Sequence, residues 1–263
     1  MANSMISWIS NRFTSLIDEL GGIAILTKEI FHSILTTKIE WNQVLYQLYQ
    51  AGSRSQGVIL ITGAFTGMVL ATQTYFQFHT VKMDTATLAV VGVAMTTELG
   101  PVLTGLMVAG RVGAAFAAEL GTMRVTEQID ALRTLATHPV DYLVVPRTIA
   151  LLTAMPLLTA EAMAIGILAG YIVGVYLLGI DPTYSWHHMI RYTDVQDLTM
   201  GIVKSAVFGF IVALIGCYKG LNCPEGAEGV GHATTEAVVN ISIAILITNF
   251  FLTLGLGKLL GVL

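Results

Sequence analysis

Charged residues are scarce in this chain of 263 residues, because Asp, Glu, Lys and Arg together make up only 11% of it. A water-soluble domain usually carries about 25% charged residues, so this chain has too little charge to cover a surface that faces water. Hydrophobic residues reach 54% and the mean hydropathy is +0.73, which predicts an integral membrane protein. The net charge of -4 is mild and gives no indication of nucleic-acid binding.

The sequence also lacks the patterns of catalytic and metal-binding proteins. Its two cysteines, Cys217 and Cys223, form neither a disulfide framework nor a metal-ligand spacing. No G-x-x-x-x-G-K-S/T phosphate loop, G-x-S-x-G motif or H-E-x-x-H motif is present. We therefore expect no metal, no cofactor and no enzymatic activity, with any ATP bound by a separate subunit. Residues 1–10 carry no positive charge, so we expect no secretory signal.

Long apolar stretches are what the chain has instead. A bilayer core needs about 20 apolar residues per helix, and five stretches qualify: 57–78, 85–110, 142–180, 198–218 and 233–257. The third is long and contains Arg147, Pro156 and Glu161, and we interpret it as one tilted helix because the part before Glu161 is too short to span alone. The pattern predicts an all-α membrane protein with about five transmembrane helices, whose permease domain covers residues 53–263.

Residues 1–52 are amphipathic and not long enough in apolar sequence to span. Apolar residues recur there at helical spacing in two groups: Ile9, Phe13, Leu16, Ile17 and Leu20, then Trp41, Val44, Leu45, Leu48 and Tyr49. Such helices can lie in the membrane interface, although packing on the cytoplasmic side of the protein is the alternative. With the N-terminus inside, the cytoplasmic segments hold nine of the 13 Lys and Arg residues, which favours this orientation: Arg12, Lys28, Lys38, Arg54, Arg111, Arg124, Arg133, Arg147 and Lys219.

Charged residues inside the spans are candidates for function, because each is costly in a bilayer. Glu98 lies in the second span, three residues before Pro101, and a proline there leaves the carbonyl of Thr97 without its helical hydrogen bond. Lys204 lies in the fourth span at a depth from which its long side chain can reach Glu98. We predict a Glu98–Lys204 pair that faces an internal cavity, with a purely structural ion pair as the alternative. Glu161 has no equally clear partner.

Two further patterns concern contacts between helices and between proteins. Glycines four residues apart, in 63–67 and 166–174, allow close helix packing, either within the chain or between two copies. Segment 119–139 lies between two spans and is predicted to form a short amphipathic helix. We expect Thr126 to be its N-cap and Glu127 to lie in its first turn. Ile129, Leu132 and Leu135 would form its apolar edge, and Pro139 would end it. Such a helix fits a groove in a soluble partner, and an ordinary solvated connector is the alternative.

Four short motifs resemble the MlaE family, the permease subunits of the bacterial Mla and Mce lipid transporters. They are Glu98-Leu99-Gly100-Pro101, Ala109-Gly110-Arg111-Val112-Gly113, Ala118-Glu119-Leu120-Gly121-Thr122-Met123 and Thr126-Glu127-Gln128-Ile129-Asp130-Ala131-Leu132. Gly67-Met68-Val69-Leu70 and Pro146-Arg147 fit as well, so the resemblance covers about residues 45–260. Two positions differ from members that carry arginine there: Thr97, just before the glutamate, and Glu236, near the start of the last span.

The resemblance implies an ABC transporter of phospholipid in the inner membrane of a Gram-negative bacterium, where it would maintain outer-membrane lipid asymmetry. The permease would be a homodimer bound to two ATPase subunits, a small STAS-domain protein and a periplasmic ring of MCE-domain proteins. Segment 119–139 would be the coupling helix, with Glu127, Asp130 and Arg133 as its contacts to the ATPase.

For the phospholipid substrate that the resemblance implies, we predict a cavity open toward the periplasm. Leu70 and Phe78 share one face of the first span at a depth near Leu99, so these three residues would contact the acyl tails, with Glu98 and Lys204 at the polar wall. Ordinary helix packing is the alternative for each apolar residue. A different function class would be an ion- or proton-coupled secondary transporter that uses Glu98 and Glu161, but the sequence contains no second copy of the Glu98–Pro101 pattern, and paired broken helices are typical of that class.

Overall fold

The computed structural model describes residues 2–259, together with the side chains of residue 14 and residues 17–259. Within that part of the chain all regular structure is helical. The α-helices are α1 (Ala2–Thr36), α2 (Trp41–Leu48), α3 (Gln56–Thr80), α4 (Thr87–Ala94), α5 (Gly100–Val108), α6 (Ala114–Val125), α7 (Gln128–Thr134), α8 (Val145–Ile172), α9 (Pro182–Tyr192), α10 (Val195–Leu221) and α11 (Gly226–Leu259).

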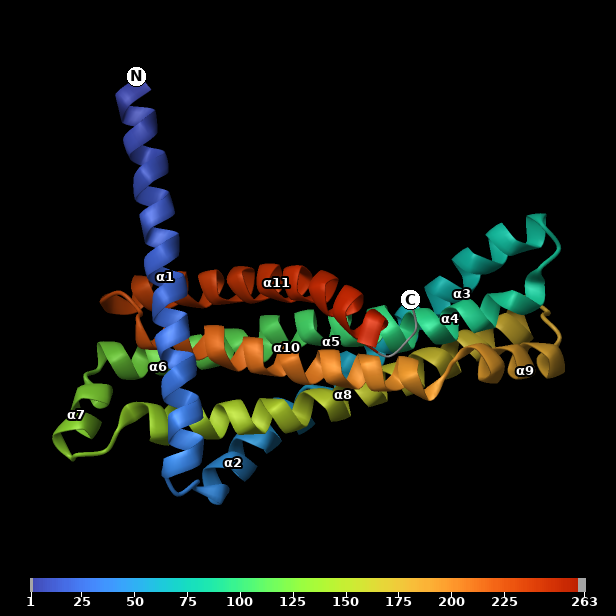
Figure 1. The fold of residues 1–263 in the computed structure, drawn as a ribbon. Helices are drawn as coiled ribbons and strands as arrows, with labels where there is room; N and C mark the ends of the chain where they lie inside the picture. The colour runs from blue at the N-terminus through green and yellow to red at the C-terminus, as the bar shows by residue number, and fades with distance from the viewer. Residues whose placement is uncertain (1, 260–263) are drawn as a thin grey trace.

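Five helical columns are long and apolar enough to cross a membrane, which confirms the predicted fold class. They run over Trp41–Thr80, Asp84–Val125, Val140–Leu177, Val195–Leu221 and Gly226–Leu259. Short π-helical turns lie between the α-helices of the first two columns and at both ends of α8 in the third, so the third apolar stretch forms one continuous helix, as expected. The columns lie lengthwise beside one another, with α1 and α7 at one end and α9 at the other (Figure 1). We refer to these as the α1 end and the α9 end.

Small residues bring α3 and α8 into close contact. A Cβ atom added to Gly67 would lie 1.9 Å from the backbone oxygen of Gly166, and one added to Gly63 would lie 2.8 Å from that of Ala162. No side chain can occupy such a position without moving one backbone away from the other. The glycine row of the first span therefore packs within the chain, against α8.

The columns share one main core and one smaller one. The main core contains Phe208 of α10, Leu151 and Met155 of α8, and Ile241 of α11, all fully buried. A second cluster toward the α9 end comprises Ala71, Leu88, Val91 and Met95, against which Leu70 and Leu99 pack. By contrast, α11 keeps an apolar face uncovered along its length, formed by Val239, Ile243, Leu246, Ile247, Phe250, Phe251 and Leu254.

Helix α1 is a single helix that crosses the bundle near one end and does not run along it (Figure 1). It packs through Leu26 and Ile30, which are buried, while Ile25 and Phe31 stay exposed. Its C-terminal part is held by a hydrogen bond from Ser33 to Asp141, which lies directly before α8. Of the first predicted apolar group, Ile9, Phe13 and Leu16 lie outside the described side chains. In the second group, Val44 of α2 is buried against the bundle and Trp41 and Leu45 are exposed.

Candidate functional site

The candidate site is built around a π-helical turn in the second span. Residues Met95–Leu99 form this turn immediately before α5, and Pro101 follows it. Proline has no N–H group, so the carbonyl of Thr97 loses its ordinary helical donor. Single π-helical turns inside α-helices are frequent at functional sites because they leave backbone groups free. Here the turn presents one free carbonyl and one carboxylate at the same depth.

The ammonium group of Lys204, on α10, donates hydrogen bonds to three partners at this site. Its Nζ atom lies 2.7 Å from Glu98 Oε1, 2.9 Å from the Thr97 carbonyl oxygen and 2.8 Å from Thr253 Oγ1. The side chain is completely buried, and its hydrogen-bonding capacity is fully used. The predicted Glu98–Lys204 contact is thus formed, and the carbonyl that Pro101 leaves free has the same lysine as its donor.

The close approach of α10 depends on Gly201, one turn before Lys204. A Cβ atom at this position would meet the Thr96 carbonyl oxygen at 2.1 Å. Glycine lets the two backbones touch at the π-helical turn, which brings the lysine within reach of the carboxylate. The sequence therefore supplies the proline, the glycine and the lysine that this one contact requires.

Helix α11 completes the site with two residues that the sequence analysis did not assign to it. Asn249 Nδ2 donates to Glu98 Oε2 at 2.8 Å, and Thr253 Oγ1 lies 2.8 Å from Glu98 Oε1. The two residues are four apart and so share one helix face. A polar amide in an apolar span is itself an indication of function. This rule would have identified Asn249 from the sequence. The Oδ1 atom of Asn249 is buried and has no partner among the described residues.

The Glu98 side chain is partly exposed, although its partner Lys204 is buried. Its side chain is 36% exposed, whereas that of Lys204 is 0% exposed. A half-exposed carboxylate that is held in place by an ammonium group, an amide and a hydroxyl can receive hydrogen bonds from a polar ligand group. The apolar residues predicted to contact lipid tails lie nearby in part: Leu70 and Leu99 pack on one cluster, and Phe78 is half-buried two helical turns further along α3.

Glu161 belongs to a different environment. Its Oε1 atom accepts a hydrogen bond from Gln56 Nε2 at 2.9 Å, and it lines a cavity between α2, α3 and α8. Within the described residues it shares no hydrogen bond with the Glu98 network. The two acids that a proton-coupled mechanism would use are therefore not brought together.

The segment between the second and third spans differs from its predicted form at its start. Thr126 ends α6 and its hydroxyl bonds back to the Thr122 carbonyl oxygen, so its prediction as an N-cap was wrong. Glu127 precedes α7 in the left-handed conformation, with φ of 58°, and does not lie in the first turn. The physical reason is that α6 continues through residues 119–125 and leaves only seven residues for α7. Of the predicted apolar edge, Ile129 is buried and Leu135 is 74% exposed.

Comparison with known proteins identifies the family. The model of the permease family named Permease MlaE matches residues 44–254 of this chain. The chain belongs to the MlaE permease family. The matched range contains the whole Glu98–Lys204 network and α7. It therefore includes every residue that we assign to the site.

Related proteins have the same character. A probable ABC transporter permease protein of Rickettsia bellii is 44% identical over 245 residues, which cover 93% of this chain and 95% of that protein. A probable ABC transporter permease protein of Synechocystis is 44% identical over 228 residues, 87% of each chain. The chloroplast protein TRIGALACTOSYLDIACYLGLYCEROL 1 of Arabidopsis thaliana is 38% identical over 231 residues, 88% of this chain and 66% of that protein. This MlaE-family chain is thus a multi-pass membrane permease.

Thr97 and Glu236, the two positions set apart in the sequence, have local partners in the structure. The hydroxyl of Thr97 donates a hydrogen bond to the Val93 carbonyl oxygen within its own helix at 2.8 Å. The backbone carbonyl of Thr97 accepts a hydrogen bond from Lys204. Glu236 accepts a hydrogen bond from Lys219 at 3.0 Å, and Lys219 also contacts Glu19 of α1 at 2.8 Å. Each position therefore has a local partner in this chain.

Proposed function

We propose that the chain is the membrane subunit of an ABC transporter that moves phospholipid between the inner and outer membranes and so maintains outer-membrane lipid asymmetry. The observation that carries the proposal is the partly exposed Glu98, fixed by Lys204 and Asn249 inside spans that contain few charged residues. A bilayer solvates such a group poorly, so a polar ligand or a water-filled cavity must meet it. A phospholipid supplies a polar headgroup for this position and acyl tails for the neighbouring apolar residues Leu70, Phe78 and Leu99.

The relatives support lipid as the substrate class. The name of the Arabidopsis relative is that of a galactose-bearing diacylglycerol, a molecule with two acyl tails and a polar head. An ABC permease also needs an ATPase partner, because the described chain contains no nucleotide-binding motif of its own. We assign α7 with Glu127, Asp130 and Arg133 to that contact, and a STAS-domain subunit and a periplasmic MCE-domain ring to the remaining assembly.

The distribution of positive residues and the exposed face of α11 support a proposed orientation and a proposed dimer of the permease. Arg124, Arg133, Arg147 and Lys219 all lie toward the α1 end, and positive residues concentrate on the cytoplasmic side of membrane proteins. The α1 end would then face the cytoplasm of a Gram-negative cell, with the N-terminus inside and the permease in the inner membrane. Helix α11 is the least covered span, since 17% of its most apolar window is buried. A homodimer that closes around this face and Glu98 would enclose one cavity at the two-fold axis.

Photo-cross-linking tests the substrate assignment in native membranes. Photoreactive residues at positions 70, 78 and 99 should capture phospholipid specifically, whereas the same residue at Leu157, which is 64% exposed on α8, should capture it less specifically. Glu98→Ala and Lys204→Ala should impair lipid transport and outer-membrane integrity more than they lower the amount of protein in the membrane. If both variants transport normally, or if they fail only because the protein disappears from the membrane, the site does not serve the substrate.

A further inference from the structure

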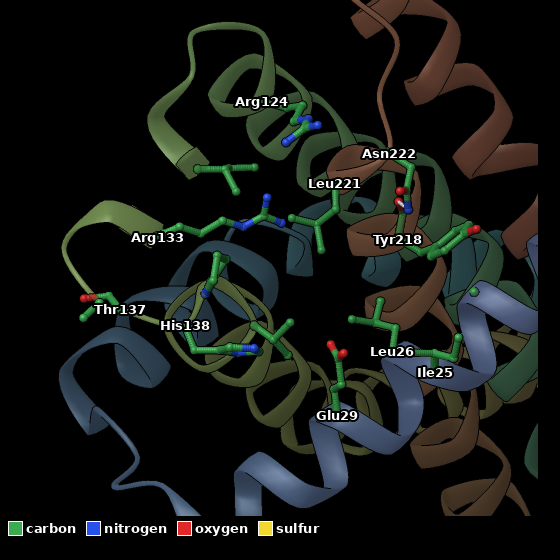
Figure 2. Close-up of a pocket in the computed structure, with 15 residues that line it drawn as sticks. Ile25, Leu26, Glu29, Arg124, Arg133, Thr137, His138, Tyr218, Leu221 and Asn222 are labelled. Carbon is green, nitrogen blue, oxygen red and sulfur yellow. Dashed lines mark hydrogen bonds between the residues drawn. The ribbon is translucent and has the colours of Figure 1, made fainter. Parts of the chain in front are cut away.

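A second cavity lies at the α1 end, away from the Glu98 network. Its volume is about 700 Å³, and its walls come from α1, the end of α6, α7 with the loop after it, and the end of α10. Figure 2 shows the space between these elements, with side chains from each wall directed toward it. In Figure 1, α7 is the outermost element at this end, past the level at which α1 crosses the spans. The cavity therefore lies near the tip of the bundle.

The charges around this cavity are unequally distributed. Arg124, Arg133 and His138 line it from the α6–α7 side, and Glu29 of α1 is the single acid among its lining residues. The two guanidinium groups share one acceptor outside the lining, Asp130 Oδ1, at 3.4 and 3.1 Å. Each arginine side chain has five N–H donors, and among the described residues each guanidinium group donates a hydrogen bond only to Asp130. Figure 2 shows Arg133 and Glu29 extending into the space from opposite walls.

The interior behind these charges is apolar. Leu26 of α1, Ile129 of α7 and Val140 are buried and contribute to the lining, together with Leu221 at the end of α10. An occupant must therefore combine an apolar surface with negative charge directed at α7. Two arginines that are only partly neutralised favour an anionic partner such as a carboxylate, because a guanidinium group pairs bidentately with carboxylate and phosphate groups.

We propose that this cavity receives an acidic segment of the ATPase subunit, with apolar side chains that enter between α1 and α7 and a carboxylate that binds Arg124 and Arg133. The inference rests on the proposed function, since it deepens the contact assigned to α7. It makes α1 a part of the docking surface, whereas a coupling helix alone would place the contact on α7. Glu29, the single acid in the lining, would repel the incoming carboxylate.

The sign of the charge effects tests this proposal. The permease is reconstituted in nanodiscs and titrated with its purified ATPase subunit. Arg124→Gln with Arg133→Gln should weaken binding at least tenfold, since charged hydrogen bonds are lost, and Glu29→Gln should tighten it. Arg191→Gln, which removes an exposed arginine from α9 at the other end of the bundle, is the matched control and should leave binding unchanged.

Filling the cavity supplies an independent measurement. Thr137→Trp and Ile25→Trp introduce bulk at two lining positions on different elements and should reduce binding, whereas Leu20→Trp on the exposed surface of α1 should not. A photoreactive residue at position 137 should capture the ATPase subunit, identified by mass spectrometry. Capture of lipid, unchanged binding in all cavity variants, or equal weakening by Glu29→Gln and the arginine pair would overturn the proposal. Absence of any ATPase binding to the unmodified permease would instead contradict the proposed function.

Discussion

Lys204 and Glu98 differ in how much each depends on the other. Lys204 is fully buried, and Glu98 is the only charged partner that its described contacts include, whereas Glu98 is 36% exposed and also bonds to Asn249 and Thr253. Removal of one member of a buried pair is costly when the remaining charge is sealed from solvent. The same removal costs less when the remaining group can still reach water or other donors.

This asymmetry predicts an order of stability. Glu98→Ala should lower the free energy of unfolding by about 3 kcal/mol, and Lys204→Met should lower it by about 1 kcal/mol, because its partner keeps two hydrogen bonds. The double variant should recover part of the loss, as expected for coupled residues. The thermal unfolding midpoint of the purified protein measures each effect. A larger loss for Lys204→Met would show that the buried lysine is not the dependent partner.

Cys223 allows a prediction on thiol reactivity. It lies between α10 and α11, and burial raises the pKa of its thiol above the ordinary value. Only the thiolate reacts with alkylating reagents, so a raised pKa means less thiolate at neutral pH and slower alkylation. We expect maleimide labelling at pH 7 to be slower for the folded protein than for the unfolded protein, and to accelerate as the pH rises. Equal rates in both states at pH 7 would contradict the burial of this thiol.

At the scale of elements, the α3–α8 contact fixes the position of the first span. Gly67 and Gly57 lie in the same helix but in opposite environments, because a Cβ atom at Gly57 would meet nothing within 4 Å. Gly67→Leu should therefore separate the two helices and prevent recovery of monodisperse protein. Gly57→Leu should leave the yield unchanged or raise it, since glycine disfavours the helix interior by about 1 kcal/mol. Size-exclusion chromatography compares the two, and similar profiles would place the α3–α8 contact elsewhere.

The sequence predicted the elements of the fold well and their junctions less well. Spans were recognisable because an uncharged stretch of about 20 residues has few other uses, and the boundaries of α3 and α10 lie within a few residues of those expected. The start of α7 was mispredicted, because Thr126 and Glu127 suit a helix start locally, and the continuation of α6 depends on packing that no local pattern records. The full length of α1 could not be predicted from local periodicity either, because the spacing of apolar residues in 1–52 indicated only two separate amphipathic groups.

For the site, the sequence identified the charges but not their surroundings. Pro101 and Glu98 indicated a free carbonyl and a carboxylate at one depth, and the reach of Lys204 followed from helix geometry. Asn249 and Thr253 were not assigned, because the arrangement of the fifth span around the second depends on tertiary packing. The cavity near Arg133 could not be found either, since it requires α1 to cross residues more than 100 positions away in the chain.

For the whole molecule, the exposed face of α11 carries the prediction of a homodimer. In a variant whose two native cysteines are replaced, cysteines at positions 246 and 250 should form cross-linked dimers in membranes. A cysteine at Leu168, which is exposed on α8, should cross-link much less. Native mass measurement of the active complex should then show two permease chains. A complex with one permease chain would contradict the dimer, and cross-links stronger at position 168 would move the interface to α8.

The second column has a further consequence, because Asp84–Val125 comprises 42 residues. At about 1.5 Å per residue it is roughly 63 Å long, about twice the thickness of a hydrocarbon core. Arg111 and Glu119 lie in its second half, and charged residues are costly within the hydrocarbon core. The column therefore extends beyond the core at the α1 end. In a variant whose two native cysteines are replaced, we expect a cysteine at the exposed position Thr122 to react with a water-soluble maleimide in opened membrane vesicles, and no reaction there would contradict this placement.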